Sequence, residues 1–180
     1  RGRYREGRRI AEELVALAER LGDRVLLLEA HHAMSPSALW LGEPETTRRH
    51  AEQGIALYDR DQHRSLALLY GGHDPGVCCH MHSGLALWLL GYPTASLERS
   101  RAGLALAQDL GHAGSIVNAF PFACTVYQLR GDVASLGGAA DSMIALSTTH
   151  GFPTWLAFGR ILDTWIQSEQ GRGEAAIAQL

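Results

Sequence analysis

Glycines that precede an expected helix recur along this chain at a nearly constant period. The separations are 40, 49, 40 and 40 residues, between Gly2, Gly42, Gly91, Gly131 and Gly171. A second series lies twenty residues after three of these positions, at Gly22, Gly111 and Gly151. A fixed period in this range indicates a repeat architecture in which each unit stacks on the next. The gap of 49 is then one 40-residue unit that carries nine extra residues.

Residue types also recur at fixed distances from the glycines of the first series. Leucines stand fifteen residues after the first four, at Leu17, Leu57, Leu106 and Leu146. Small residues stand seven before the later ones, at Ser35, Gly84, Cys124 and Thr164. Large aliphatic residues fill a shared core, and small residues let two helix backbones approach closely. We therefore expect the four leucines to be buried, each at the same place in its unit.

Each unit contains two helical segments, in which apolar residues recur at steps of three and four. Four of the six prolines stand where a helix should begin, and no segment alternates with period two. We expect an all-α fold, a right-handed superhelical array of about four antiparallel helix pairs. Helices are predicted at about 3–21, 24–41, 44–58, 75–90, 93–110, 113–130, 133–149, 153–170 and 172–180. The insertion, at about 59–73, contains the apolar run SLALLY and is predicted to be ordered.

Composition excludes several classes of function. The 180 residues carry a formal net charge of −3, and all 16 basic residues are arginine. The chain has no large positive field that would attract nucleic acid or an anionic membrane. It also has no lysine that could form a Schiff base or serve in a P-loop. Three cysteines make no disulfide framework, and no apolar run approaches about 18 residues. We expect a reduced, cytoplasmic protein that binds neither nucleic acid nor membrane.

The order of small residue, turn glycine, small residue and aliphatics on paired helices resembles the tetratricopeptide repeat. The longer period is similar to a variant in bacterial signalling proteins, in MalT-like activators and in class III cyclases fused to predicted ATPases. The cyclase-linked regions resemble this chain in AEQGIALYD (51–59), HRSLALLYG (63–71), DPGV (74–77) and ALWLLGYP (86–93). This resemblance implies a regulatory repeat region in a multidomain protein.

The chain also stops at Leu180, inside an expected helix, where an array should have a polar cap. We therefore expect residues 1–180 to be a single repeat domain, a fragment of a longer protein. The sequence contains no phosphate-binding G-x-x-x-x-G-K-[ST] motif and no cyclase-like set of metal-binding carboxylates. Any catalysis is expected elsewhere in the parent protein, and no cofactor is expected here.

The densest set of possible metal ligands is the run Cys78-Cys79-His80-Met81-His82, with His73 and Asp74 just upstream. On a helix, Cys78 and His82 are one turn apart and could reach one zinc ion. A structural zinc site needs four ligands, usually from paired motifs, and the sequence offers no second pair. We therefore expect no zinc site, with the cysteines as small core residues and the histidines partly exposed.

The resemblance places the partner-binding surface on the inner, concave face of the first helix of each unit. The residues expected there are Glu29, His32, Met81, Trp88, Asn118, Gln128, Phe158 and Trp165. Central amides and flanking aromatics are typical of a surface that holds a peptide, a partner domain or another part of the same chain. The tryptophans are equally compatible with core positions. A small-molecule sensor is the alternative, because MalT-like arrays bind their inducer on the repeats. An open groove would favour the first function and a deep closed pocket the second.

Overall fold

The computed structural model describes residues 3–174, and every regular element in that range is a helix. Eight helices are long and two are single turns. Their bounds are α1 (Tyr4–Leu21), α2 (Arg24–Trp40), α3 (Pro44–Leu57), α4 (Arg60–His63), α5 (Leu66–Leu69), α6 (Pro75–Leu89), α7 (Pro93–Leu110), α8 (Ala113–Leu129), α9 (Val133–His150) and α10 (Pro153–Glu169). The predicted all-α class is confirmed. The ninth predicted helix, 172–180, falls mostly outside the described residues.

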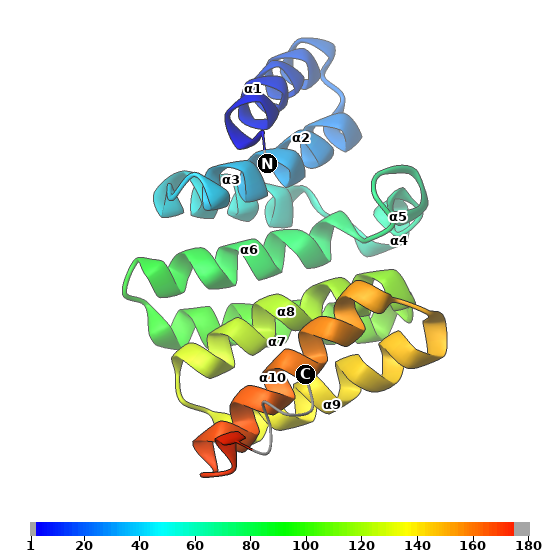
Figure 1. Ribbon diagram of the computed structural model, residues 1–180. Helices are drawn as coiled ribbons and strands as arrows, with labels where there is room; N and C mark the ends of the chain where they lie inside the picture. Colours follow the sequence, from blue (N-terminus) through cyan, green and yellow to red (C-terminus); the bar gives the residue numbers. More distant parts are fainter. Residues whose placement is uncertain (1–2, 175–180) are drawn as a thin grey trace.

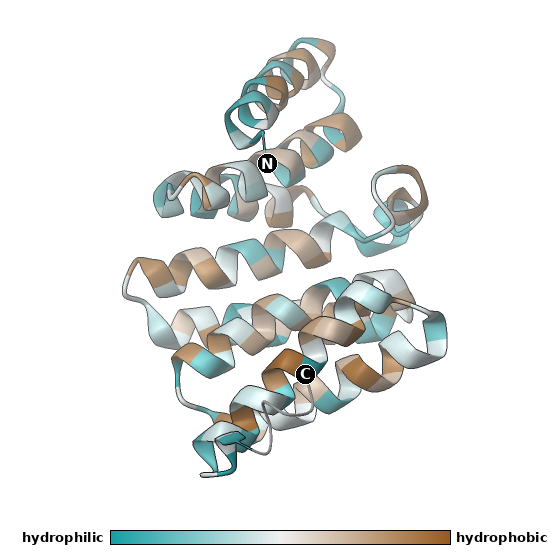
Figure 2. Ribbon diagram, viewed as in Figure 1, coloured by the Kyte–Doolittle hydropathy of each residue, from teal (hydrophilic) through white to brown (hydrophobic). Residues whose placement is uncertain are grey.

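The long helices form a stack that runs along the chain from the N-terminal to the C-terminal end (Figure 1). Each long helix packs on the next one in sequence, and α2 also packs on α6 and α6 on α8. The first helices α2, α6 and α8 therefore lie next to one another. The first helix α10 lies in front of α9 (Figure 1) and shares an apolar cluster with α8. Figure 2 shows hydrophobic residues along all the long helices rather than in one central layer. This distribution is expected of an array in which neighbouring units make the core.

Local signals explain why the helices begin and end where they do. All eight long helices lie within one residue of their predicted bounds. Prolines occupy the first turn of α3, α6, α7 and α10, where a missing N–H costs no helical hydrogen bond. The Asp74 carboxylate accepts a hydrogen bond from the Val77 amide and caps α6. Gly111 ends α7 with φ of 65°, a left-handed conformation that favours glycine.

The prediction that four equivalent leucines are buried is wrong. Leu17 is 38% exposed, and the other three, Leu57, Leu106 and Leu146, are only partly buried. The residues that directly follow three of these leucines, Ala18, Ala107 and Ser147, are buried. Successive helical residues point about 100° apart, so the leucines lie on the flank of the buried stripe.

The buried stripe of the second helices consists mainly of small residues. Nine residues after the turn glycines stand Ala11, Ala51, Ser100 and Ala140, each at most 2% exposed. Five residues after the later glycines stand Thr47, Ser96 and Leu136, all fully buried. Small side chains allow a second helix to lie close to the first helices on either side. The repeat is thus maintained by close backbone approach more than by a column of leucines.

The insertion at 59–73 contains α4 and α5 and lies beside the N-terminal end of α6 (Figure 1). It buries His63, Leu66 and Ala67, while Leu68 and Leu69 stay exposed. The His63 imidazole accepts a hydrogen bond at Nδ1 from the Asp59 amide, 2.8 Å away. These contacts hold the start of the insertion against the array.

In the part of the chain that the structure describes, no helix combines the length and the apolar character needed to cross a bilayer.

Candidate functional site

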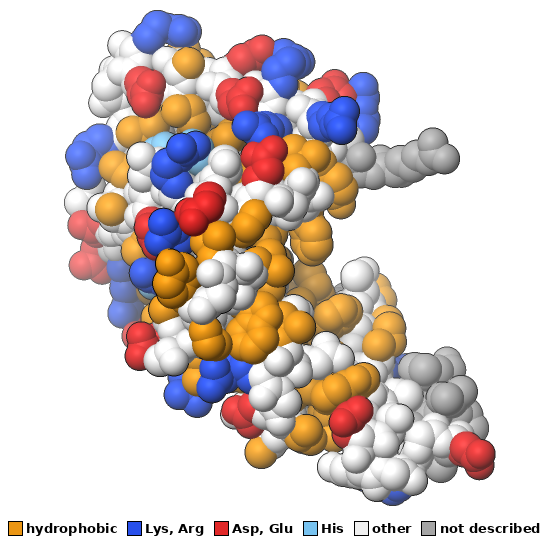
Figure 3. Space-filling model, turned by 90° about the vertical axis from the view of Figure 1, so that its left-hand side faces the viewer, with side chains coloured by type: hydrophobic (Ala, Val, Ile, Leu, Met, Phe, Trp, Pro, Cys, Tyr) orange, Lys and Arg blue, Asp and Glu red, His pale blue; other side chains and the backbone are white. Residues whose placement is uncertain are grey.

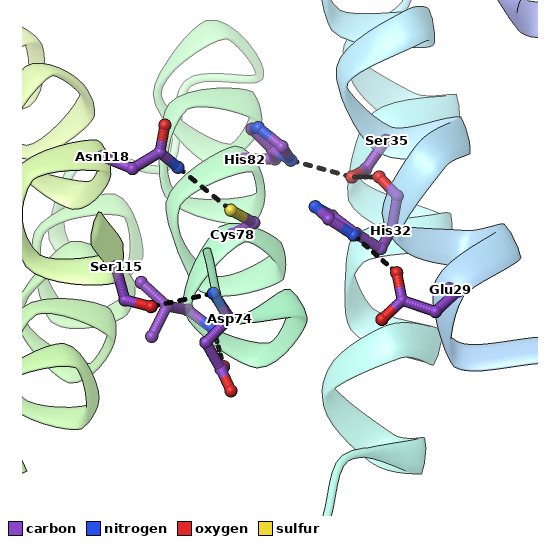
Figure 4. A network of polar contacts seen from close by, with 9 residues as sticks. Glu29, His32, Ser35, Asp74, Cys78, His82, Ser115 and Asn118 are labelled. Carbon is purple, nitrogen blue, oxygen red and sulfur yellow. Dashed lines mark hydrogen bonds and ion pairs between the residues drawn. The ribbon is translucent and has the colours of Figure 1, made fainter. Parts of the chain in front are cut away.

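A network of polar side chains connects the first helices α2, α6 and α8 (Figure 4). Between α2 and α6, the Ser35 hydroxyl lies 2.8 Å from His82 Nδ1. Between α6 and α8, Asn118 Nδ2 donates to Cys78 Sγ at 3.1 Å, and the Ser115 hydroxyl accepts from the Asp74 amide at 2.8 Å. Such bonds depend on the relative position of two helices, so they form only when adjacent units pack in this arrangement.

His82 is a buried neutral group at the centre of this network. Burial, followed by the nearby His32 and His73, lowers the pKa of His82 to about 3. The Ser35 hydroxyl, which donates to the His32 carbonyl oxygen at 3.1 Å, also hydrogen-bonds to His82 Nδ1. The His82 ring meets Phe122 edge to face, with centroids 5.1 Å apart. The expectation that this histidine is partly exposed is wrong, because the packing of α2 and α8 on α6 covers it.

The N-terminal end of α6 holds two further buried groups. Burial raises the pKa of the Cys78 thiol well above its usual range, and the side chain is 1% exposed. Burial also raises the pKa of Asp74, against the opposing effect of its bonds to the Val77 amide and the Tyr58 hydroxyl. Tyr58 donates that bond to Oδ2 at 2.8 Å. The thiol is therefore protonated at neutral pH unless a bound cation replaces its proton.

The residues predicted from the sequence fall into three groups. Glu29 and His32 are nearly buried and hydrogen-bonded to each other at 3.0 Å. Met81 is fully buried with Val77, Ala107 and Ala119, so it forms core and is left out of the binding surface proposed below. The remaining five are partly buried: Trp88, Asn118, Gln128, Phe158 and Trp165.

The two aromatic residues of α10 pack on the largest apolar cluster of the chain while keeping part of their surface in solvent. Phe158 and Trp165 both lie against the cluster that includes Phe120 and Leu162. Ile161, one turn after Phe158, is 53% exposed. This side of α10 therefore exposes apolar surface, and its aromatic side chains are held in place by the apolar cluster that they pack on.

The molecule is hollowed on one side. Figure 3 shows a curved body whose N-terminal and C-terminal arms project around an open hollow, with hydrophobic side chains along its walls. The view is turned so that the left side of Figure 1 faces the reader, and the hollow thus opens toward the front of Figure 1. That is the side on which the first helices lie. The hollow is open and broad rather than a closed pocket.

One cluster of possible metal ligands appears only in the tertiary structure. Ligand atoms of His32, His73 and Cys78 all lie within 4.8 Å of one another. The rings of His32 and His73 meet edge to face, with centroids 5.3 Å apart. The sequence run 78–82 pointed to Cys78 and His82, but His82 bonds Ser35 instead. No local spacing connects His32 with His73 or Cys78, so sequence inspection missed the combination.

Comparison with solved structures identifies a similar fold. No protein-family model matches the sequence, and no curated protein matches it. A crystal structure of a Rap protein complexed with competence and sporulation factor aligns with a TM-score of 0.76 at 15% sequence identity. The fold is similar to that of this Rap protein.

The alignment covers 97% of this chain and 47% of the Rap chain, so this chain spans about half of that protein's length. At 15% identity the match concerns the fold. It supports a tetratricopeptide-like array of antiparallel helix pairs. The more specific likeness to MalT-like and cyclase-linked regions stays a prediction.

Proposed function

We propose that this chain is a non-catalytic helical-repeat module that binds a peptide or a protein segment in its hollow. The observation that carries the proposal is the open hollow on the side of the first helices (Figure 3). A broad concave surface suits an extended segment that contacts several repeats at once. The Rap protein of similar fold was crystallised with competence and sporulation factor, which supports a peptide or protein as the partner.

The side chains proposed for this surface suit such a partner. Trp88, Phe158 and Trp165 are partly buried, so part of each side chain is held by packing and part is exposed to a partner. Aromatic anchors of this kind carry much of the binding energy at protein interfaces. Asn118 and Gln128 are partly buried amides on α8, which can donate to and accept from an extended backbone. Specificity would come from the apolar anchors, and orientation from the amides.

The biological setting is also a proposal. By its resemblance to repeat regions of bacterial signal-transducing ATPases and cyclases, the module would act in the cytoplasm as a regulatory scaffold. Its partner could then be another protein or another segment of the same polypeptide. In either case, binding of the partner in the hollow would change how the first helices pack on one another, and attached domains would respond to that change.

The test combines binding with stability. A peptide library displayed on phage is selected against the wild-type chain, and the selected peptides are then measured against Asn118→Ala/Gln128→Ala. We expect the double variant to melt within a few degrees of wild type and to bind the peptides at least tenfold more weakly. The matched control removes two exposed amides from second helices, Gln53→Ala/Gln108→Ala, and should bind as wild type does. Equal binding by the Asn118/Gln128 variant, or its unfolding, would show that the functional face lies elsewhere.

A small-molecule sensor is a second candidate, and one pocket favours it. A cavity of about 340 Å³ lies beside the insertion. Arg60, Arg64, Asp109 and His112 are among its polar lining residues. This volume is within the range of small-ligand sites. A thermal-shift screen that yields ligands for wild type but not for Arg64→Ala would favour the sensor, and peptide binding lost in Asn118→Ala/Gln128→Ala would favour the module proposed above.

A further inference from the structure

Two parts of the chain that are far apart in sequence, His32 and the neighbouring pair His73 and Cys78, bring two nitrogens and a sulfur close together. His32 lies on α2, His73 at the end of the insertion and Cys78 in the first turns of α6. Their nearest ligand atoms all lie within 4.8 Å of one another. His32 Nδ1 is occupied by the Glu29 carboxylate at 3.0 Å, which leaves its Nε2 for the cluster.

This geometry is close to that of a tetrahedral metal centre. Zinc binds histidine nitrogen at about 2.0–2.1 Å and cysteine sulfur at about 2.3 Å, which separates neighbouring ligand atoms by about 3.5 Å. The observed spacing of up to 4.8 Å therefore requires the ligand atoms to approach one another by at most about 1.3 Å. Rotation of the His73 side chain, which lies at the end of a loop and is only partly buried, can supply that movement.

The surroundings of the three ligands match those of metal-binding histidines and cysteines. Glu29 is 5% exposed, and its Oε2 holds the His32 ring, as carboxylates do for metal-bound histidines. Its other oxygen, Oε1, is buried and has no hydrogen-bond partner among the described residues. Figure 4 shows the Glu29 carboxylate beside His32, on the side that faces α6. A buried carboxylate is costly, and a cation bound at the far nitrogen of the His32 ring would offset part of that cost.

We propose that His32, His73 and Cys78 form a zinc-binding site, with Glu29 orienting His32 and a water molecule as the fourth ligand. Two nitrogens and one sulfur favour zinc over magnesium or calcium, which prefer oxygen. On binding, the metal replaces the thiol proton of Cys78, which leaves to solvent, and no electrons are transferred. Asn118 Nδ2, 3.1 Å from the sulfur, donates to the resulting thiolate.

The site would join α2 to α6, the first helices of neighbouring units. The same ion would also hold the end of the insertion, which leads directly into α6. Through Asn118 it would also reach α8 and the surface proposed for partner binding. The site goes beyond the proposed function and does not depend on it, since zinc binding can be measured with no partner present.

The experiment titrates reduced, metal-free protein with Co²⁺ and then with competing Zn²⁺, followed by absorption spectroscopy. We expect one Co²⁺ per chain, with tetrahedral visible bands and a sulfur-to-cobalt charge-transfer band that Zn²⁺ removes. Cys78→Ser should abolish the charge-transfer band, and His73→Ala should weaken binding at least tenfold. Glu29→Gln should weaken zinc binding about 10–100-fold, the effect typical of a residue that orients a ligand.

Two control variants test whether binding is specific to these residues. Cys79 is buried next to Cys78 but points to α3, where its sulfur lies against Gly54. Cys79→Ser should therefore keep the charge-transfer band. His150 is exposed at the end of α9, so His150→Ala should bind as wild type does.

The proposal is overturned if Co²⁺ binds without a sulfur band, if the band persists in Cys78→Ser, or if Zn²⁺ at one equivalent leaves the melting temperature and spectrum unchanged. Should Cys78→Ser fail to fold, His73→Ala decides the question, because its partly exposed loop position tolerates truncation. Unchanged binding in folded His73→Ala would contradict the site.

Discussion

Gly103 lies in the middle of α7, on the side that packs against α6. A Cβ atom at this position would meet the end of the Met81 side chain and lie 2.8 Å from His80 Cβ. Met81 is flexible and can move, but His80 Cβ is attached directly to the backbone of α6. Gly103→Ala therefore has to push α6 and α7 apart, although alanine is the better helix former.

The magnitude follows from two opposing effects. Overpacking a close contact typically costs about 1–3 kcal/mol. Replacing glycine by alanine inside a helix contributes about 1 kcal/mol in the other direction. We expect a net loss of up to about 2 kcal/mol in the free energy of unfolding. For a chain of this size, that lowers the melting temperature by up to about 8 °C.

The assay is urea denaturation and thermal melting followed by far-ultraviolet circular dichroism. The matched control is Gly138→Ala in α9, where an added Cβ meets nothing within 4 Å. This second variant has the same chemistry without the close contact, so it should stabilise the chain by about 0.5–1 kcal/mol. If Gly103→Ala stabilises the chain as much as Gly138→Ala does, the argument that close helix approach maintains the repeat is refuted.

Three further predictions concern buried or partly buried positions. Ser100 has a buried hydroxyl with no partner among the described residues, so Ser100→Ala should raise the free energy of unfolding by about 1 kcal/mol in urea titrations; a loss would reveal a missed partner. Leu136 is fully buried, so Leu136→Ala should lower the free energy of unfolding by about 2–5 kcal/mol. Leu106 is only partly buried, so Leu106→Ala should lower it by less. A larger loss for Leu106→Ala than for Leu136→Ala would contradict the assignment of the buried stripe. Burial, then the neighbouring His31, lowers the pKa of His50 to about 4, below its unfolded value of about 6.5. The unfolded chain then binds more protons between these values, and stability is lost as the pH falls from about 6.5 to 4. Urea denaturation at pH 7 and 4.5 should show that His50→Gln loses about 2 kcal/mol less unfolding free energy than wild type does. Equal losses would argue against a neutral, partly buried His50.

Helix positions followed from the sequence because their signals are local. A proline fixes φ for one residue, an aspartate such as Asp74 caps the turn that follows it, and a glycine such as Gly111 supplies the left-handed conformation that ends a helix. Each signal acts within about four residues, so the predicted bounds agree with the structure to within one residue. The 40-residue period, likewise visible in sequence, gave the paired array.

The identity of the buried stripe did not follow from the sequence. Leucines at a fixed column look like core, yet Leu17 is exposed while Ala11 and Ala18 are buried. Hydrophobicity alone cannot rank a leucine and an alanine on adjacent faces of one helix. Their burial depends on how closely the neighbouring helices approach, and small residues permit the closest approach.

The partners of the polar side chains were decided by tertiary structure alone. In sequence, Cys78 and His82 look like a pair, and His32 looks like a concave-surface residue. In the fold, His82 bonds Ser35 of α2, and Cys78 lies near His32 and His73. The contacts between side chains of different units depend on how α2, α6 and α8 are offset along their axes. They also depend on the position at which the insertion ends and α6 begins. Those distances are set by packing between helices, and no spacing along the chain records them.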